Sequence, residues 1–186
     1  MANILLAYCS VYGYTRKICE TLKAELEGRG QRVDVVPLVG GSADPARYDV
    51  IVIGASIRHG KHNPAVLDFI RANRALLESK PGGFFSVNLV ARKPDKNTPE
   101  TNPYVKKFLR RTPWKPQLVG VFGGNLDYPR YGTVDRNVIR LIMWLTGGPT
   151  NPQTKVEYTD WDEVRRYAAK IAALALGANP RATKHQ

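Results

Sequence analysis

Residues 4–15 have the sequence ILLAYCSVYGYT, in which a short apolar run passes directly into a loop rich in hydroxyl groups. The run over residues 4–8 is typical of a central strand that is buried on both faces of a parallel sheet. From Thr15 onward, Ile18 and Leu22 lie on one stripe of a helical pattern. A loop between a strand and a helix N-terminus directs backbone N–H groups and the positive end of the helix dipole at an anion. The sequence therefore predicts a phosphate site at residues 10–15.

This loop differs from the two common nucleotide-binding loops. It lacks the Gly-Lys-Ser/Thr of the nucleoside-triphosphate loop and the Gly-x-Gly-x-x-Gly of the dinucleotide fold. Gly13 permits a tight turn and a close approach of the backbone to a ligand. Hydroxyl groups without a lysine suit a phosphate monoester that is bound without a metal ion. The alternative is a plain helix cap after a strand.

Short apolar runs alternate with amphipathic segments along the rest of the chain, which predicts an α/β fold with a doubly wound, five-stranded parallel sheet. The Asn-Pro pairs at 63–64 and 102–103 suit the N-cap and first position of two helices, and the first of these is expected to include Leu77. A final helix is expected from Asp160 to Leu176, with Glu163 in a capping box. The other strands are expected at 32–38, 50–53, 84–90 and 118–122, with Gly54 ending the third.

Residues 127–157 separate the fifth strand from the final helix. A structureless connection of roughly 30 residues is uncommon unless it carries function. We therefore expect an insertion with its own helix at 134–145 that rejoins the sheet at 155–158. The whole is expected to be one domain over residues 1–177, followed by a flexible basic tail at 178–186.

The composition is that of a globular protein with an unusual charge. The chain has 186 residues, with 28 Lys and Arg against 16 Asp and Glu, which gives a net charge of +12. Such a balance attracts polyanions, anionic lipid or multi-carboxylate substrates. Cys9 and Cys19 match no metal site and are expected to be buried, reduced thiols. Because no signal peptide or long apolar run is visible, we expect a cytoplasmic protein.

Three further loops follow predicted strands, at residues 54–60, 86–93 and 123–130. Each is rich in Gly, Asn, Ser, Arg or aromatic residues. Ligands of open parallel sheets bind at the carboxyl ends of the strands. These loops are therefore expected to gather around the same ligand as residues 10–15.

The pattern Ser-x-x-Gly-x-Thr at residues 10–15 resembles the phosphate loop of flavodoxins, which holds the phosphate of FMN. Tyr12 departs from that pattern, which usually has a small hydroxyl residue there. The longer strings GASIRHGKHNPAVLDFI (54–70), SVNLVARKPDKNTPETN (86–102), GGNLDYPRY (123–131) and KVEYTDW (155–161) resemble the flavodoxin-like, menaquinone-dependent protoporphyrinogen IX dehydrogenases of bacteria over nearly the whole chain.

The resemblance implies a flavodoxin-like fold and an enzyme of haem biosynthesis. It would oxidise protoporphyrinogen IX to protoporphyrin IX and pass electrons through FMN to a membrane quinone, either menaquinone or ubiquinone. The residues that this assigns to FMN are Ser10, Val11, Tyr12, Gly13, Tyr14, Thr15, Ala55, Ser56, Ile57, Arg58, Asn88, Leu89, Val90 and Asn125.

Cations and aromatic residues in the same loops are candidates for substrate binding. Guanidinium groups bind carboxylates in a bidentate fork, so arginines there suit the propionates of the substrate. His59 is a candidate proton shuttle, with His62 as a near competitor. For each of these residues, the alternative to a functional role is an ordinary place on the surface or in the packing. The substrate candidates are Arg92, Lys93, Tyr128, Arg130 and Tyr131, and the catalytic candidates are His59, Arg58 and Arg92.

The predicted insertion helix is basic and amphipathic. Its apolar face would carry Leu141 and Leu145, and Arg136 and Arg140 lie together elsewhere on it. Such a segment can lie on an anionic membrane surface. With the charge of +12, this favours peripheral attachment at the inner face of the cell membrane, while packing against the sheet edge is the alternative.

Three other functions are alternatives. An electron-carrier flavodoxin shares the fold but normally has an acidic surface, opposite to the charge here. An NAD(P)H:quinone reductase is a second alternative. A nucleic-acid-binding module is the third, but no nucleic-acid motif is visible and no nucleic-acid partner is expected. The sequence is compatible with a homo-oligomer.

Overall fold

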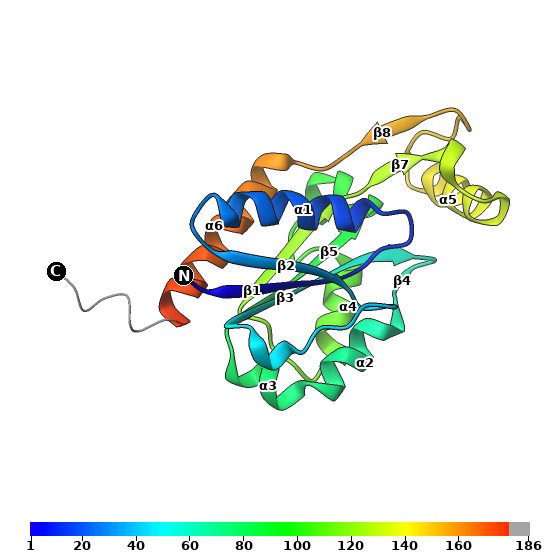
Figure 1. The fold of residues 1–186 in the computed structure, drawn as a ribbon. Coiled ribbons are helices and arrows are strands. Elements are labelled where there is room, and N and C mark those ends of the chain that lie inside the picture. The colour runs from blue at the N-terminus through cyan, green and yellow to red at the C-terminus, as the bar shows by residue number, and fades with distance from the viewer. Residues whose placement is uncertain (179–186) are drawn as a thin grey trace.

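Five parallel strands form the centre of the computed structural model, which describes residues 1–178 (Figure 1). Their order is β2-β1-β3-β5-β6, and the two-residue β4 pairs antiparallel with the end of β3. This confirms the predicted doubly wound sheet. The bounds are β1 Asn3–Cys9, β2 Arg32–Pro37, β3 Val50–Arg58, β4 Lys61–His62, β5 Gly82–Asn88 and β6 Leu118–Gly123.

Helices cover both faces of this sheet. Alternate residues of β1 point to opposite sides, so that Ile4 and Leu6 pack with α1 and α6 while Leu5 and Ala7 pack with the helices of the other face. The helices of the first face are α1 Tyr14–Glu27 and α6 Trp161–Ala178, and those of the second are α2 Pro64–Ala72, α3 Arg74–Ser79 and α4 Pro103–Arg111.

The predicted Asn-Pro helix starts are confirmed. The Asn63 side chain accepts a hydrogen bond from the backbone N–H of Ala65 (3.0 Å), and Asn102 does the same for Tyr104 (3.1 Å). The expectation that one helix runs from 64 to Leu77 is wrong, because the helix is interrupted at Asn73 and Leu77 belongs to α3.

The last helix has a simpler cap than expected. Asp160 alone accepts hydrogen bonds from the N–H groups of residues 162 and 163 at 2.9 and 3.2 Å. The Glu163 carboxylate pairs with Arg166 instead (2.7 Å), and within residues 1–178 it makes no reciprocal capping-box bond.

Gly54 does not end the third strand, as the sequence suggested; β3 continues through it to Arg58. A Cβ at Gly54 would lie 2.2 Å from Cζ of Phe85, so glycine is required here by close packing against the neighbouring strand. The fourth parallel strand also differs from the predicted 84–90. It ends at Asn88, whose side chain accepts from the N–H of Ala91 (3.0 Å) and starts the 3-10 turn η2, Leu89–Arg92.

The insertion forms a separate arm, here defined as residues 125–157. It contains β7 Asn125–Asp127, the turn η4 Tyr128–Arg130, α5 Thr133–Leu145 and β8 Lys155–Glu157. The expected return to the main sheet at 155–158 is wrong, because β8 pairs antiparallel with β7 in a sheet of two strands. The arm extends beyond the carboxyl edge of the main sheet (Figure 1). Its own small core comprises Leu126, Tyr128, Tyr131 and Met143.

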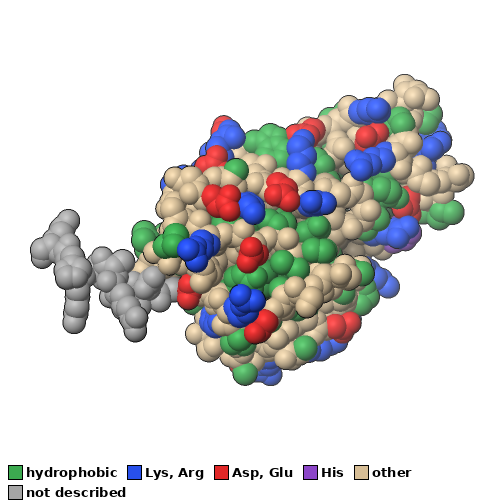
Figure 2. All heavy atoms as spheres, in the orientation of Figure 1, with side chains coloured by type: hydrophobic (Ala, Val, Ile, Leu, Met, Phe, Trp, Pro, Cys, Tyr) green, Lys and Arg blue, Asp and Glu red, His purple; other side chains and the backbone are tan. Residues whose placement is uncertain are grey.

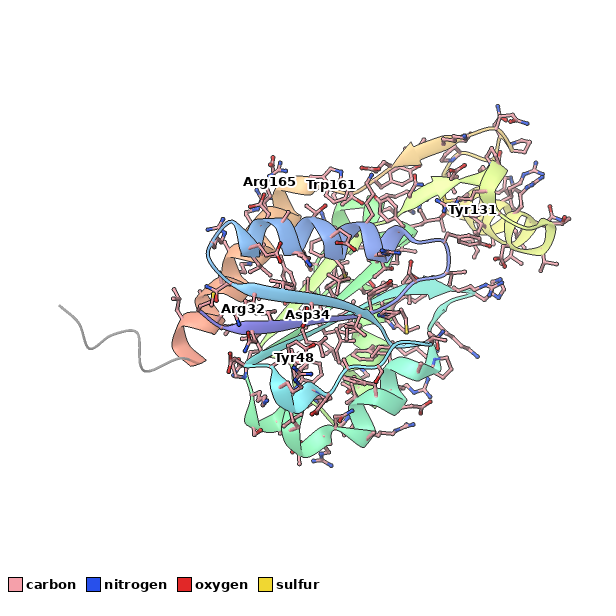
Figure 3. The ribbon with its side chains drawn as sticks, in the orientation of Figure 1. Arg32, Asp34, Tyr48, Tyr131, Trp161 and Arg165 are labelled. Atoms are coloured by element: carbon pink, nitrogen blue, oxygen red, sulfur yellow. The ribbon has the colours of Figure 1, made fainter. Side chains whose placement is uncertain are left out.

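The base of the arm is tied to α1. Lys17 pairs with Glu157 at 2.8 Å and lies over the ring of Trp161, 5.0 Å from its centroid. Trp161 lies beside α1, whereas Tyr131 lies within the arm (Figure 3). Tyr14 shares a hydrogen bond of 2.6 Å with Thr159. The start of α1 and the segment that connects the arm to α6 are therefore held together by these contacts.

Both cysteines are free and buried, as expected. Burial raises the pKa of the Cys9 thiol to about 11. Within residues 1–178, no helix combines the length and apolar character needed to cross a membrane. From residue 179 onward, the expected flexible tail lies outside the described residues.

Candidate functional site

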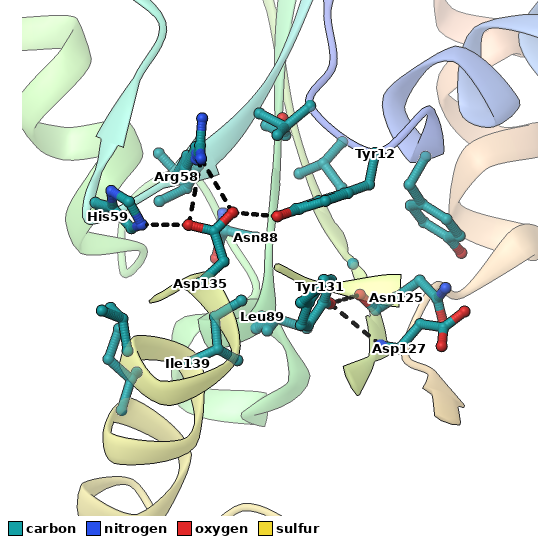
Figure 4. A pocket seen from close by; sticks show the side chains of 18 of the residues that line it. Tyr12, Arg58, His59, Asn88, Leu89, Asn125, Asp127, Tyr131, Asp135 and Ile139 are labelled. Atoms are coloured by element: carbon teal, nitrogen blue, oxygen red, sulfur yellow. Dashed lines mark hydrogen bonds and ion pairs between the residues drawn. The ribbon is translucent and has the colours of Figure 1, made fainter. Parts of the chain in front are cut away.

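A pocket opens where the carboxyl ends of the strands meet the arm (Figure 4). Its walls come from the loop after β1, the end of β3, the turn η2 and the arm. The structure therefore brings together the four loops that the sequence predicted to meet. The predicted residues that line it are Ser10, Val11, Tyr12, Tyr14, Ser56, Ile57, Arg58, His59, Asn88, Leu89, Val90, Asn125, Arg130 and Tyr131.

The loop after β1 has the form of an anion cradle. Gly13 precedes α1 in the left-handed conformation, with φ of 79°, which favours glycine. The Ser10 hydroxyl accepts from the N–H of Thr15 at 3.2 Å. Thr15 is fully buried, and its hydroxyl has no hydrogen-bond partner within the described part of the chain. A buried hydroxyl without a partner is costly, so this cradle fits a ligand that carries acceptor oxygens.

Tyr12, the departure from the flavodoxin pattern, points away from this cradle. Its hydroxyl donates to Asp135 on the arm, and its ring lies 4.9 Å from that of Tyr131. Burial is the largest cause that raises the Tyr12 pKa, followed by the hydrogen bond to Asp135. Tyr12 therefore connects the cradle to the arm.

Asp135 joins three elements at the mouth of the pocket (Figure 4). Its carboxylate lies 2.7 Å from Nε2 of His59 and 3.1 Å from the guanidinium of Arg58, in addition to its bond with Tyr12. The residue is only 4% exposed. The Tyr12 hydroxyl, followed by His59 and Arg58, holds the Asp135 pKa below its ordinary value against the opposing effect of burial.

Sequence reasoning missed Asp135 because nothing marked it except an acid in the first turn of a helix. It also missed Tyr104 and the pocket-facing side of α5. Val138, Ile139 and Ile142 form an apolar wall there. The amphipathic pattern of the helix was visible in the sequence, but the part of the molecule that this side would cover was not.

A chain of buried polar side chains supports the turn η2. Asn102 donates to Oδ1 of Asn88 at 3.0 Å, and Nδ2 of Asn88 donates to the Ser86 hydroxyl at 3.1 Å. The Ser86 hydroxyl can then donate to Nε2 of His62, 2.9 Å away. Asn88 therefore lines the pocket while its amide is engaged with protein groups.

His62 lies beneath the site, outside the pocket lining. Its ring packs edge-on against Phe84 and Phe108, with centroids 5.5 and 5.3 Å apart. Burial lowers the pKa of His62 to about 4. The imidazole is therefore neutral over the physiological range and acts as an acceptor for Ser86, so His59 is the histidine that faces the pocket.

Several predicted substrate residues have other partners. Arg92 donates to the carbonyl and hydroxyl of Thr146 at 3.0 and 2.8 Å, which ties η2 to the end of α5. Tyr128 is fully buried, and its hydroxyl donates to the carbonyl of Pro149 (2.7 Å). Neither residue lines the pocket, nor does Lys93.

Ala55 and two residues of the cradle, Gly13 and Thr15, also differ from the expected lining. Ala55 is buried in the core between the sheet and α2. Gly13 lines a second cavity, with Ser10 and Arg16. Thr15 is fully buried and lines neither cavity.

Comparison with known proteins shows the family of the chain. A family model described as a flavodoxin domain matches residues 5–153. A protein of Leishmania major named protoporphyrinogen IX dehydrogenase [quinone] is 44% identical over 179 residues, which cover 95% of this chain and 78% of that protein. The Escherichia coli protein of the same name is also 44% identical, over 91% of this chain and 94% of its own length.

Solved flavodoxins share the fold at low sequence identity. A flavodoxin of Pseudomonas aeruginosa matches with a TM-score of 0.53 at 12% identity, covering 94% of this chain and 99% of that one. Flavodoxin 1 of Bacillus cereus matches with a TM-score of 0.52 at 14% identity, covering 92% and 97%. The chain belongs to the flavodoxin family, and within it to the group of proteins related to protoporphyrinogen IX dehydrogenase [quinone].

Proposed function

We propose that this chain binds FMN and oxidises protoporphyrinogen IX to protoporphyrin IX, with a quinone as the final electron acceptor. The observation that carries the proposal is the unpaired, buried hydroxyl of Thr15 in a hydroxyl-rich cradle beside the pocket. It is supported by 44% identity, over most of the chain, to proteins named for this reaction.

The cradle and the two flanking loops provide the contacts that FMN requires. Ser10 and Thr15, with the backbone N–H groups of their loop, would hold the phosphate. Ile57 at the end of β3 and Leu89 in η2 both line the pocket and would flank the ring. When bound there, FMN supplies a two-electron acceptor that can be reoxidised by a quinone.

The outer part of the pocket suits a large, mostly apolar macrocycle with carboxylates at one edge. The wall of Val138, Ile139 and Ile142 offers apolar contact and excludes water. Arg58 is 54% exposed at the rim and can bind a propionate while it remains near Asp135. Nε2 of His59 is engaged by Asp135, so Nδ1 is the atom that would accept a proton from the substrate.

The decisive experiment compares two reductants without oxygen. Purified protein loaded with FMN is mixed with protoporphyrinogen IX and, separately, with NADPH, and the flavin absorbance is followed. Bleaching by the porphyrinogen, and recovery of colour on addition of a quinone, are expected. Rapid bleaching by NADPH alone would instead favour an NAD(P)H:quinone reductase.

Removing the Thr15 hydroxyl should weaken FMN binding. The substitution Thr15→Val keeps the shape of the side chain but deletes the donor. We expect the Kd for FMN to rise by about tenfold or more, because a hydrogen bond to a charged group contributes about 1.5–3 kcal/mol. Thr15→Ser retains the hydroxyl and serves as the control. A flavin fluorescence titration measures both variants, and an unchanged Kd in Thr15→Val would show that the phosphate lies elsewhere.

The exposed face of α5 supports attachment to an anionic membrane surface. Leu141, Trp144 and Leu145 are 56%, 69% and 67% exposed, although large apolar side chains are usually covered. Lys and Arg side chains lie on the arm as well as over the rest of the face in the view of Figure 2. Apolar side chains flanked by cations are the pattern of a helix that lies in the lipid interface. We propose peripheral attachment at the inner face of the cell membrane, which would bring a lipid-dissolved quinone close to the pocket.

Leu145→Ser should lower binding to vesicles that contain anionic phospholipid by about fivefold, because one half-inserted leucine contributes on the order of 1 kcal/mol. Leu176→Ser is the matched control, since Leu176 is equally exposed (65%) but lies at the far end of α6. Co-sedimentation measures both. Equal loss of vesicle binding in the two variants would exclude α5 as the membrane contact. If the wild type does not bind vesicles but forms a dimer that Leu145→Ser abolishes, this face is an interface between two copies.

A further inference from the structure

The phosphate cradle leaves a charge unbalanced. A phosphate monoester carries nearly two negative charges at neutral pH, and residues 10–15 contain no cation. The nearest basic residues of α1 are engaged elsewhere. Arg16 pairs with Glu20 at 3.5 Å, and Lys17 pairs with Glu157 at 2.8 Å. The helix dipole alone corresponds to about half a charge.

The arm brings one cation to this place. Nη2 of Arg130 lies 4.0 Å from the position that a Cβ would take on Gly13, the glycine of the cradle. Arg130 also lines the pocket. It makes no hydrogen bond or ion pair with any other residue in the described range 1–178, whereas Arg58 and Arg92 both have partners.

The backbone that carries Arg130 is held firmly. The preceding Tyr128 is fully buried, and its hydroxyl is bonded to Pro149. The N–H of Tyr131 donates to the carbonyl of Tyr128 at 3.1 Å, which closes the turn η4. The guanidinium therefore extends from a fixed point toward the cradle.

Tyr12 explains why a cation from outside the loop is needed. The flavodoxin pattern has a small hydroxyl at this position, but the hydroxyl of Tyr12 is turned toward Asp135. The loop has lost one phosphate donor and gained a contact with the arm. The same arm presents Arg130, whose planar fork suits phosphate oxygens.

We propose that Arg130 binds the phosphate of FMN, so that the arm completes a site which the loop alone leaves open. This inference rests on the proposed binding of FMN. The phosphate of FMN then takes the place of the substrate propionate as the partner of Arg130.

The test compares FMN with riboflavin, which lacks the phosphate. We expect Arg130→Met to raise the Kd for FMN about tenfold and to leave the Kd for riboflavin unchanged. The Kd for FMN of Arg130→Lys should lie between those of the wild type and Arg130→Met. Lys155→Met is the matched control, because it removes one exposed charge from the arm outside the pocket lining. The dependence of FMN affinity on salt concentration should be weaker in Arg130→Met than in the control.

Each other outcome overturns the inference. Equal weakening of FMN and riboflavin would mean that Arg130 supports the ring or the arm. An unchanged Kd for FMN with a raised KM for protoporphyrinogen IX would return Arg130 to the substrate carboxylate. If the wild-type protein binds neither flavin, the proposed function itself fails, and this result is distinct from a failure confined to the Arg130 variants.

Discussion

Replacing Asp135 with asparagine is expected to accelerate amide hydrogen exchange in the first half of α5 by about 30- to 160-fold. The change keeps the size of the side chain but removes the charge that accepts from Tyr12, His59 and Arg58. A hydrogen bond to a charged group contributes about 1.5–3 kcal/mol. Because Arg58 and His59 are about half exposed and regain water when released, we expect a net loss of only about 2–3 kcal/mol from the three.

The effect should be local, because the rest of the arm has other attachments. Its base is tied to α1 through Glu157 and Lys17. The end of α5 is tied to η2 through Thr146 and Arg92. Only the start of α5 depends on Asp135. Exchange should therefore increase more in the first half of α5 than in the second.

Asp162→Asn is the control, because that carboxylate is 68% exposed and pairs only within α6. The dependence on pH gives a second check. The pKa of Asp135 is held below its ordinary value of 3.8, so its contribution is complete above that value and is lost as pH falls through the lower pKa of the folded state. The arm should stay docked in mild acid. Unchanged exchange in Asp135→Asn at neutral pH would refute the role of this carboxylate.

The sheet and its loops could be predicted from sequence because local patterns determine them. The apolar runs indicate buried parallel strands, and parallel strands place their carboxyl ends on one edge. The loops at residues 10–15, 54–60 and 86–93 therefore had to meet. The Asn-Pro helix starts were also local, since Asn63 and Asn102 bond to the N–H groups two residues later.

The missed features depend on partners that are distant in sequence. Gly54 suggests the end of a strand in the sequence, but in the structure it is required by the close contact with the Phe85 ring. Asp135 lies 123 residues from Tyr12 and 76 from His59. The return segment at 155–158 has the pattern of a strand, but the pattern does not say that its partner is β7. In each case the tertiary contact determines the role of the residue, and no local propensity marks it.

His62 should make the protein sensitive to acid well above the pKa of its carboxylates. Its pKa is lowered from 6.5 to about 4 by burial. In the unfolded chain, His62 therefore takes up a proton as pH falls below 6.5, whereas in the folded chain His62 stays neutral until about pH 4. Stability should be lost over that interval, by about 3 kcal/mol at about 1.36 kcal/mol for each pH unit of difference.

His62→Gln removes the titration and keeps a polar group near Ser86. Urea unfolding at pH 7 and at pH 4.5 measures both proteins, and the wild type should lose about 2 kcal/mol more than the variant over this interval. At pH 7 the variant should be the less stable one, because it lacks the ring contacts with Phe84 and Phe108. His59→Gln, measured in parallel, separates this effect from that of the Asp135 cluster. Parallel losses in the wild type and His62→Gln would contradict the assignment.

The same proton should reach the flavin site. Once protonated, His62 can no longer accept from the Ser86 hydroxyl, and the hydroxyl proton loses its acceptor, since Asn88 is a donor to the same oxygen. Asn88 starts the turn η2, whose residues Leu89 and Val90 line the pocket. FMN affinity should therefore decline as pH falls toward 4 in the wild type, and decline less in His62→Gln. Equal declines in a flavin titration across this range would mean that the buried histidine acts on stability alone.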